Sequence, residues 1–151
     1  MTKMRILLFF PLLAGCSSLT LQNVDFGWPV ESAVSVGSTG MFEDPQRGLG
    51  VNVSPLSMAE FQDSTALRGA KLRILRSIAG YYFITGAHFK HVYVFRPVEN
   101  ALSLYTTIDV STAGLKEPAL NQRPPYVELL DAALPTPLRL THDGVVEGGK
   151  Q

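Results

Sequence analysis

The chain contains a single cysteine, Cys16, so no disulfide can form within it. Secreted domains usually pair their cysteines, and a lone free thiol in an oxidising compartment would be a liability. A long apolar run is missing as well. The run near the N-terminus covers only residues 6–13, whereas a helix that spans a bilayer needs about 20 apolar residues. The sequence therefore predicts neither a disulfide-stapled domain nor a membrane-spanning helix.

The N-terminal segment nevertheless has the features of a secretory signal peptide in the right order. Lys3 and Arg5 precede the apolar run, and small residues stand directly before Cys16. Residues 13–16 read Leu-Ala-Gly-Cys, and the segment 1–16 resembles the signal and lipobox of bacterial lipoproteins. The resemblance implies that the cysteine carries a diacylglycerol, that the signal is cut before it, and that its new amino group is acylated. The residues alone also fit an ordinary signal peptide with an incidental cysteine, or a buried strand.

The resemblance also sets the expected organisation and location of the chain. Ser17, not aspartate, follows the cysteine, and in the lipoprotein family this position influences sorting. The resemblance, with serine at this position, implies a lipid-anchored protein of the bacterial cell envelope, on the periplasmic face of the outer membrane. The predicted parts are a signal peptide (1–15), a lipidated tether (16–24), one β-rich domain (25–147) and a flexible tail (148–151).

Charge excludes one class of partner. Without residues 1–15, which contain two cations and no acid, 11 basic and 13 acidic residues remain, a net charge of −2. A nucleic-acid-binding protein would need a strong positive excess, so no nucleic acid is expected as a partner. Length and apolar content suit one domain that folds without metal or disulfide.

Strand-forming residues dominate the region 71–110. Four segments with alternating or β-branched and aromatic residues are separated by short turn sequences. They cover residues 71–76, 81–85, 91–95 and 102–110. This pattern predicts a four-stranded antiparallel meander in a mainly β fold, a small antiparallel sheet, sandwich or barrel. The residues expected inside form an apolar ridge of Leu102, Leu104, Ile108, Val92 and Val94. Over residues 66–80 a helix remains the alternative.

The segments before the meander have shorter and less regular patterns. Strands are expected at 26–36 and 49–53, and a short helix at 55–63. Ser54 or Ser57 would cap that helix, with Glu60 completing a capping box.

Beyond the meander, residues 111–126 read as a long polar connection that is extended before its prolines. Residues 127–134 fit either a strand or a short helix. Alternation over 138–141, followed by Asp143 and Gly144, predicts a hairpin.

No catalytic motif is readable, and no cofactor is expected. The chain has no nucleophile elbow, no zinc-protease motif and no phosphate-cradling loop. His88 and His91 are three residues apart, which on a strand places them on opposite faces, so they are not expected to share a metal. His142 beside Asp143 would supply one ligand at most.

Three features suit contact with a partner. Arg123 and Tyr126 flank two prolines, and arginine and tyrosine are common anchors at interfaces. Residues 64–98 lack acids, and Arg73 and Arg76 there would belong to a basic face toward anionic headgroups. Seven aromatic residues lie in the meander, as core or as a binding strip.

These observations predict a lipid-anchored binding or assembly module whose partner is an envelope protein or glycan. The alternative is a lipid-anchored hydrolase or transferase acting on an envelope glycan or lipid. Such an enzyme needs convergent titratable groups, and the sequence does not reveal any.

Overall fold

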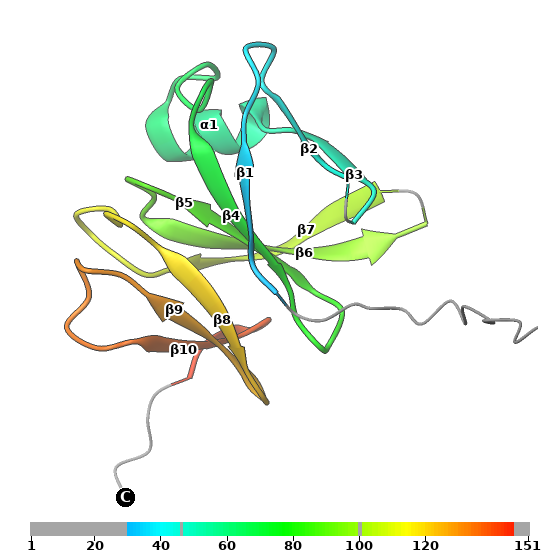
Figure 1. Cartoon of the computed structure of the whole chain (residues 1–151). Coiled ribbons are helices and arrows are strands. Elements are labelled where there is room, and N and C mark those ends of the chain that lie inside the picture. Colours follow the sequence, from blue (N-terminus) through cyan, green and yellow to red (C-terminus); the bar gives the residue numbers. More distant parts are fainter. Residues whose placement is uncertain (1–29, 46, 100, 147–151) are drawn as a thin grey trace, which may run out of the picture.

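The computed structural model describes residues 30–45, 47–99 and 101–146. Cys16 and the beginning of the strand expected at 26–36 lie outside the described residues. The structure is mainly β, as the sequence predicts (Figure 1). In chain order, its elements are β1 (Ser32–Ser35), β2 (Met41–Asp44), β3 (Leu49–Asn52), α1 (Ser54–Phe61), β4 (Lys71–Arg76), β5 (Tyr82–Gly86), β6 (His91–Val98), β7 (Ala101–Asp109), β8 (Ala119–Arg123), β9 (Tyr126–Leu130), β10 (Leu138–Thr141) and β11 (Gly144–Val145). No helix in the described part of the chain is long and apolar enough to cross a bilayer.

The predicted meander is confirmed. β4, β5, β6 and β7 pair antiparallel in chain order, and β1 adds to β4 to make a five-stranded sheet. Residues 71–76 therefore form a strand, and the alternative helix there is wrong. A second sheet has the order β11-β10-β9-β8, and β2 pairs with β3 in a separate hairpin.

The five-stranded sheet is covered on both faces. Cross-strand partners share a face, so Leu75, Phe83 and Val94 lie on one face, while Ile84 and Tyr93 lie on the other. The second sheet packs on the first face, where β8 contacts β4 and β11 contacts β7. Helix α1 reaches the opposite face through hydrogen bonds to β6.

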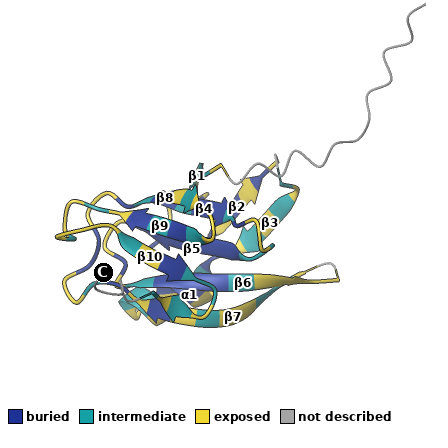
Figure 2. Ribbon diagram, turned by 90° about the horizontal axis from the view of Figure 1, so that it is seen from below, coloured by how far each residue is buried: buried dark blue, intermediate teal, exposed yellow. Residues whose placement is uncertain are grey.

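Burial follows from this arrangement. Every residue of β5 is buried, because a strand covered on both sides needs apolar or small residues at each position. Figure 2 shows the buried residues concentrated in the central strands, with the exposed ones at turns and along the outer end of the β6–β7 hairpin.

The prediction that Leu104 lies in the core is wrong. Leu104 is 52% exposed, although Val92, Val94 and Ile108 are buried and Leu102 is half-buried. The cause is a bulge: Val94 pairs with Thr106, but Phe95 pairs with Leu104, which leaves Tyr105 as an extra residue in β7. A bulge of one residue reverses the faces of all positions beyond it. Leu104 therefore does not share a face with Ile108.

The short helix is confirmed, but its predicted capping box is wrong. Val53 stands at the N-cap without a side-chain hydrogen bond, and Pro55 occupies the first turn, where its missing N–H costs nothing. Ser57 Oγ instead donates to the carbonyl of Asp63, 2.5 Å away. Glu60 turns away from the helix start and toward β6.

Two features of the C-terminal half differ from the expectation. The long connection is interrupted, because residues 119–123 form β8. The prolines permit this strand since they stand in the turn that follows it, where no ladder hydrogen bond is needed. The hairpin near the C-terminus is confirmed, but Thr141 pairs with Gly144, so its turn is His142-Asp143, one residue earlier than predicted. Residues 126–130 form a strand.

Candidate partner-binding face of the second sheet

Arg123 and Tyr126 lie at the end of the β8–β9 hairpin. They pair with each other across the two strands, and Pro124 and Pro125 form the turn between them. The side-chain amide of Gln122 donates to the carbonyl of Tyr126 at 2.8 Å, which fixes the strand end. The tight hairpin therefore holds both predicted anchors in defined positions, rather than on a long loop.

The outward face of this sheet carries a mixed row of charged and aromatic residues. Glu128 pairs with Arg139 on one side and with Asn121 on the other, so all three share a face. The Arg123 Nε lies 3.5 Å from the Glu128 carboxylate. The Arg139 guanidinium lies 5.8 Å from the centre of the Tyr126 ring, a cation–π distance. Two arginines and a tyrosine are thus gathered on one accessible surface, which we call the outer face.

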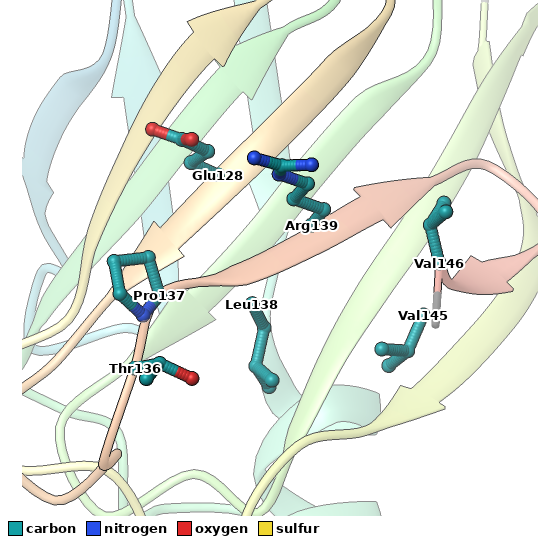
Figure 3. Close-up of a pocket in the computed structure, with 7 residues that line it drawn as sticks. All are labelled: Glu128, Thr136, Pro137, Leu138, Arg139, Val145 and Val146. Atoms are coloured by element: carbon teal, nitrogen blue, oxygen red, sulfur yellow. The ribbon is translucent and has the colours of Figure 1, made fainter. Parts of the chain in front are cut away.

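A hollow adjoins the outer face along β10. Its volume is about 510 Å³, and it is open to solvent. Figure 3 shows Glu128 and Arg139 side by side above Pro137, while Leu138 and Val145 point to the other side of the strand. On the side of the outer face, the hollow presents a cation and a carboxylate beside Pro137, which suits an extended polar segment of a partner better than an enclosed small molecule.

The other two predicted contact residues do not join this surface. Arg73 and Arg76 are three apart on β4, so their side chains lie on opposite faces of the sheet. Arg73 is half-buried and binds Glu31 at 3.2 Å. Arg76 lies over the ring of Tyr82, 5.9 Å from its centre. The structure does not bring them together as one basic face.

The aromatic residues of the meander divide between core and surface. Phe83, Phe89 and Tyr93 are buried. Near the β10–β11 turn, Tyr81 stacks on His142 with ring centres 4.2 Å apart and planes 7° apart. The Tyr105 hydroxyl donates to Asp143 at 3.1 Å, and this hydrogen bond raises the pKa of Tyr105. These contacts join the two sheets, so most of the expected aromatic strip serves packing.

A polar cluster that the sequence did not reveal lies between α1 and β6. The Glu60 side chain is fully buried, and its carboxylate accepts hydrogen bonds from the Lys90 backbone N–H and from the Tyr93 hydroxyl, the latter at 2.8 Å. His91 Nδ1 lies 2.7 Å from the same carboxylate, and its Nε2 lies 3.0 Å from Asp109. Burial and the Glu60 carboxylate raise the pKa of Tyr93.

This Glu60 cluster fastens the helix to the sheet. A hollow of about 490 Å³ lies beside it, lined by Lys90, His91 and Asp109 among others. Both ring nitrogens of His91 lie within hydrogen-bond distance of a carboxylate oxygen. His91 and Tyr93 are two residues apart on a strand, a spacing that does indicate a shared face. The sequence does not show that Glu60 lies against them, because this contact joins α1 to a strand 31 to 33 residues later in the chain.

Metal coordination finds no support in the described ranges, 30–45, 47–99 and 101–146. Within them, no group of three or more His, Cys, Asp or Glu side chains is placed to hold an ion. His142 Nε2, in the one ligand position that the sequence suggested, lies 3.3 Å from the Asp143 carboxylate.

Comparison of the chain with protein-family models, with curated proteins and with solved structures found no match.

Proposed function

We propose that the protein is a lipid-anchored lipoprotein of the bacterial envelope whose β domain works by binding a partner. The lipobox at residues 13–16 carries this proposal, together with the absence of any second cysteine in the sequence. The location that goes with it is the periplasmic face of the outer membrane, because Ser17 follows the cysteine.

We place the binding site on the outer face of the second sheet. Three of its accessible residues, Arg123, Tyr126 and Arg139, belong to the types most enriched at interface hot spots. They stand on paired strands, so little conformational entropy is lost when a partner docks. The partner in this proposal is an envelope protein or glycan with acidic and apolar groups, matching two arginines beside the hollow on β10.

Lipidation is tested at Cys16. Metabolic labelling with a fatty-acid analogue is expected to mark the wild-type chain and to leave Cys16→Ala unlabelled, because the cysteine is the attachment point. Cys16→Ala should also release the protein from the membrane fraction. Ser17→Ala is the matched control and should be labelled like the wild type. Equal labelling of Cys16→Ala and wild type would refute the lipid anchor.

The outer face is tested by crosslinking in intact envelopes. A photo-crosslinking residue at Leu130, which is exposed on the outer face of β9, is expected to capture a partner, while one at Thr39 in the β1–β2 turn is not. Arg123→Ala with Tyr126→Ala should lower capture from Leu130 by about thirtyfold, the effect of losing about 2 kcal/mol.

The same double variant should leave the fold almost intact. It removes one exposed ion pair and one exposed cation–π contact, which are worth about 1 kcal/mol together. Thermal unfolding of wild type and variant measures this. A steep drop in the melting temperature would mean that the hairpin is structural, and unchanged capture would mean that the partner binds elsewhere.

A further inference from the structure

Three segments that are distant in the sequence come together at one end of the molecule. Ser32 pairs with Ile74 in antiparallel register, so Val30, where the described chain begins, lies beside the end of β4. The β4–β5 turn follows directly, and the Ile78 backbone N–H in it donates to the Gln122 side chain at 3.2 Å. Gln122 stands next to the turn of the β8–β9 hairpin. Figure 1 shows the chain leaving β1 beside these two turns.

The residues at this end are apolar and accessible. Val30 is 60% exposed and Ile78 is 61% exposed, the two highest fractions among the large apolar residues described. The other exposed members are Ala79, Pro124 and Pro125. We call Val30, Ile78, Ala79, Pro124 and Pro125 the apolar tip.

The two turns of the apolar tip contain cations and no acid, while Glu31, next to Val30, is half-buried and binds Arg73 at 3.2 Å. Residues 76–82 and 120–126 contain Arg76 and Arg123 but no acid. The Arg123 side chain is 67% exposed. Glu128, which it approaches, is only 22% exposed and lies back along β9. Short apolar turns flanked by arginine and tyrosine are the composition that proteins place at the boundary between lipid headgroups and acyl chains.

We infer that the apolar tip rests on the headgroup layer of the membrane that holds the Cys16 lipid, with anionic headgroups beside Arg123. This inference rests on the proposed lipid anchor. Cys16 and Val30 are 14 positions apart, so even a fully extended connection keeps Val30 within about 50 Å of the acylated residue. The described chain begins within the apolar tip, so the connection from Cys16 enters the domain at this end.

The arrangement favours lipid over a protein at the apolar tip. Its apolar residues stand on two turns and at the start of the described chain, and none of them is among the residues that line the hollows beside β10, beside β3 and beside His91. A protein partner needs a complementary surface of standard size, whereas a bilayer accepts a few protruding side chains. With the apolar tip at the bilayer, the outer face of β8, β9 and β10 stands beside the membrane surface.

The test uses the acylated full chain in vesicles of phosphatidylethanolamine and phosphatidylglycerol. Acylated Cys16 is not a free thiol, so a polarity-sensitive fluorophore can be attached at Ile78→Cys or Ala79→Cys. Thr39→Cys, in the exposed turn at the far end of β1, is the matched control. Both labels in the apolar tip should shift to the blue and lose several-fold of their quenching by aqueous iodide, while the Thr39 label should not change.

A second arm tests the headgroup contact. Replacing phosphatidylglycerol by phosphatidylcholine, or changing Arg123→Gln, should lower the protection ratio at Ala79→Cys by about fivefold, the equivalent of about 1 kcal/mol per cation near an anionic surface. Equal quenching at positions 39 and 79 in vesicles overturns the inference. Protection that is seen in native envelopes but not in vesicles also overturns it and indicates a protein partner.

Failure of the proposed function is distinguishable from failure of this inference. Mass spectrometry of the same preparation reports whether Cys16 carries its acyl groups. An unmodified Cys16 refutes the lipoprotein assignment. An acylated Cys16 with a freely quenched label at Ile78 refutes only the contact of the apolar tip with the membrane.

Discussion

Leu129→Ala is expected to lower the free energy of unfolding by about 2–5 kcal/mol, whereas Leu104→Ala should lower it by less than about 1 kcal/mol. Leu129 is fully buried on the inner face of β9, so truncation leaves a cavity between the two sheets. Leu104 lies beyond the bulge in β7, where half of its surface already meets water.

Urea denaturation of the two variants measures this difference. The slope against urea concentration should stay constant, so the midpoints alone should report the stability change. Far-ultraviolet circular dichroism of both folded variants should keep the wild-type β signature. Equal losses in the two variants would show that Leu104 is buried and that β7 has no bulge at Tyr105.

Glu60→Ala is expected to be at least as damaging, with a loss of about 3–5 kcal/mol. The substitution leaves the Tyr93 hydroxyl and the Lys90 N–H without their acceptor and removes the attachment of α1 to His91. Glu117→Ala is the matched control, because Glu117 is an exposed acid and its loss should stay within about 0.5 kcal/mol. Similar effects of the two variants in the same denaturation assay would contradict a structural role for the Glu60 cluster.

The dependence of the free energy of unfolding on pH reports on the Tyr93 hydroxyl of this cluster. The pKa of Tyr93 is raised in the folded protein, chiefly by burial, so folding favours the protonated phenol. The resulting stability is fully present below the ordinary tyrosine value of about 10 and is lost progressively as the pH rises above it. Tyr93→Phe should flatten that alkaline part of the curve. An unchanged alkaline slope would show that Tyr93 is not the group responsible.

The sequence predicts the central sheet well because its strands carry their own signal. Residues 82–86 and 91–95 combine aromatic and β-branched side chains, and a turn follows each segment or lies close to it. The prediction that Leu104 lies in the core is wrong because alternation assumes an unbroken register. A bulge is set by the twist of the paired strands, and the sequence of β7 alone does not reveal it.

The candidate site could be predicted only in part. A local pattern of arginine, two prolines and tyrosine predicts Arg123 and Tyr126 as anchors, and the structure places both on an accessible hairpin, while their role in binding stays a prediction. Arg73 and Arg76 looked alike in the sequence, but the sheet separates them by face. For Glu60 the sequence predicts the second position of a capping box, because the contact that decides its role joins α1 to His91, 31 residues later in the chain.

The bonds around the beginning of β1 determine how force would enter the domain. A pull along the N-terminal chain arrives at Val30 and would peel β1, an edge strand, away from β4 one residue at a time. Arg47 opposes this by donating to the Val30 carbonyl and to Ser32. Glu31 adds bonds to Arg73 in β4 and to the Leu120 N–H in β8. Tension on the N-terminal chain would therefore be shared between both sheets, because the bonds at the beginning of the edge strand must break before β1 can separate from β4.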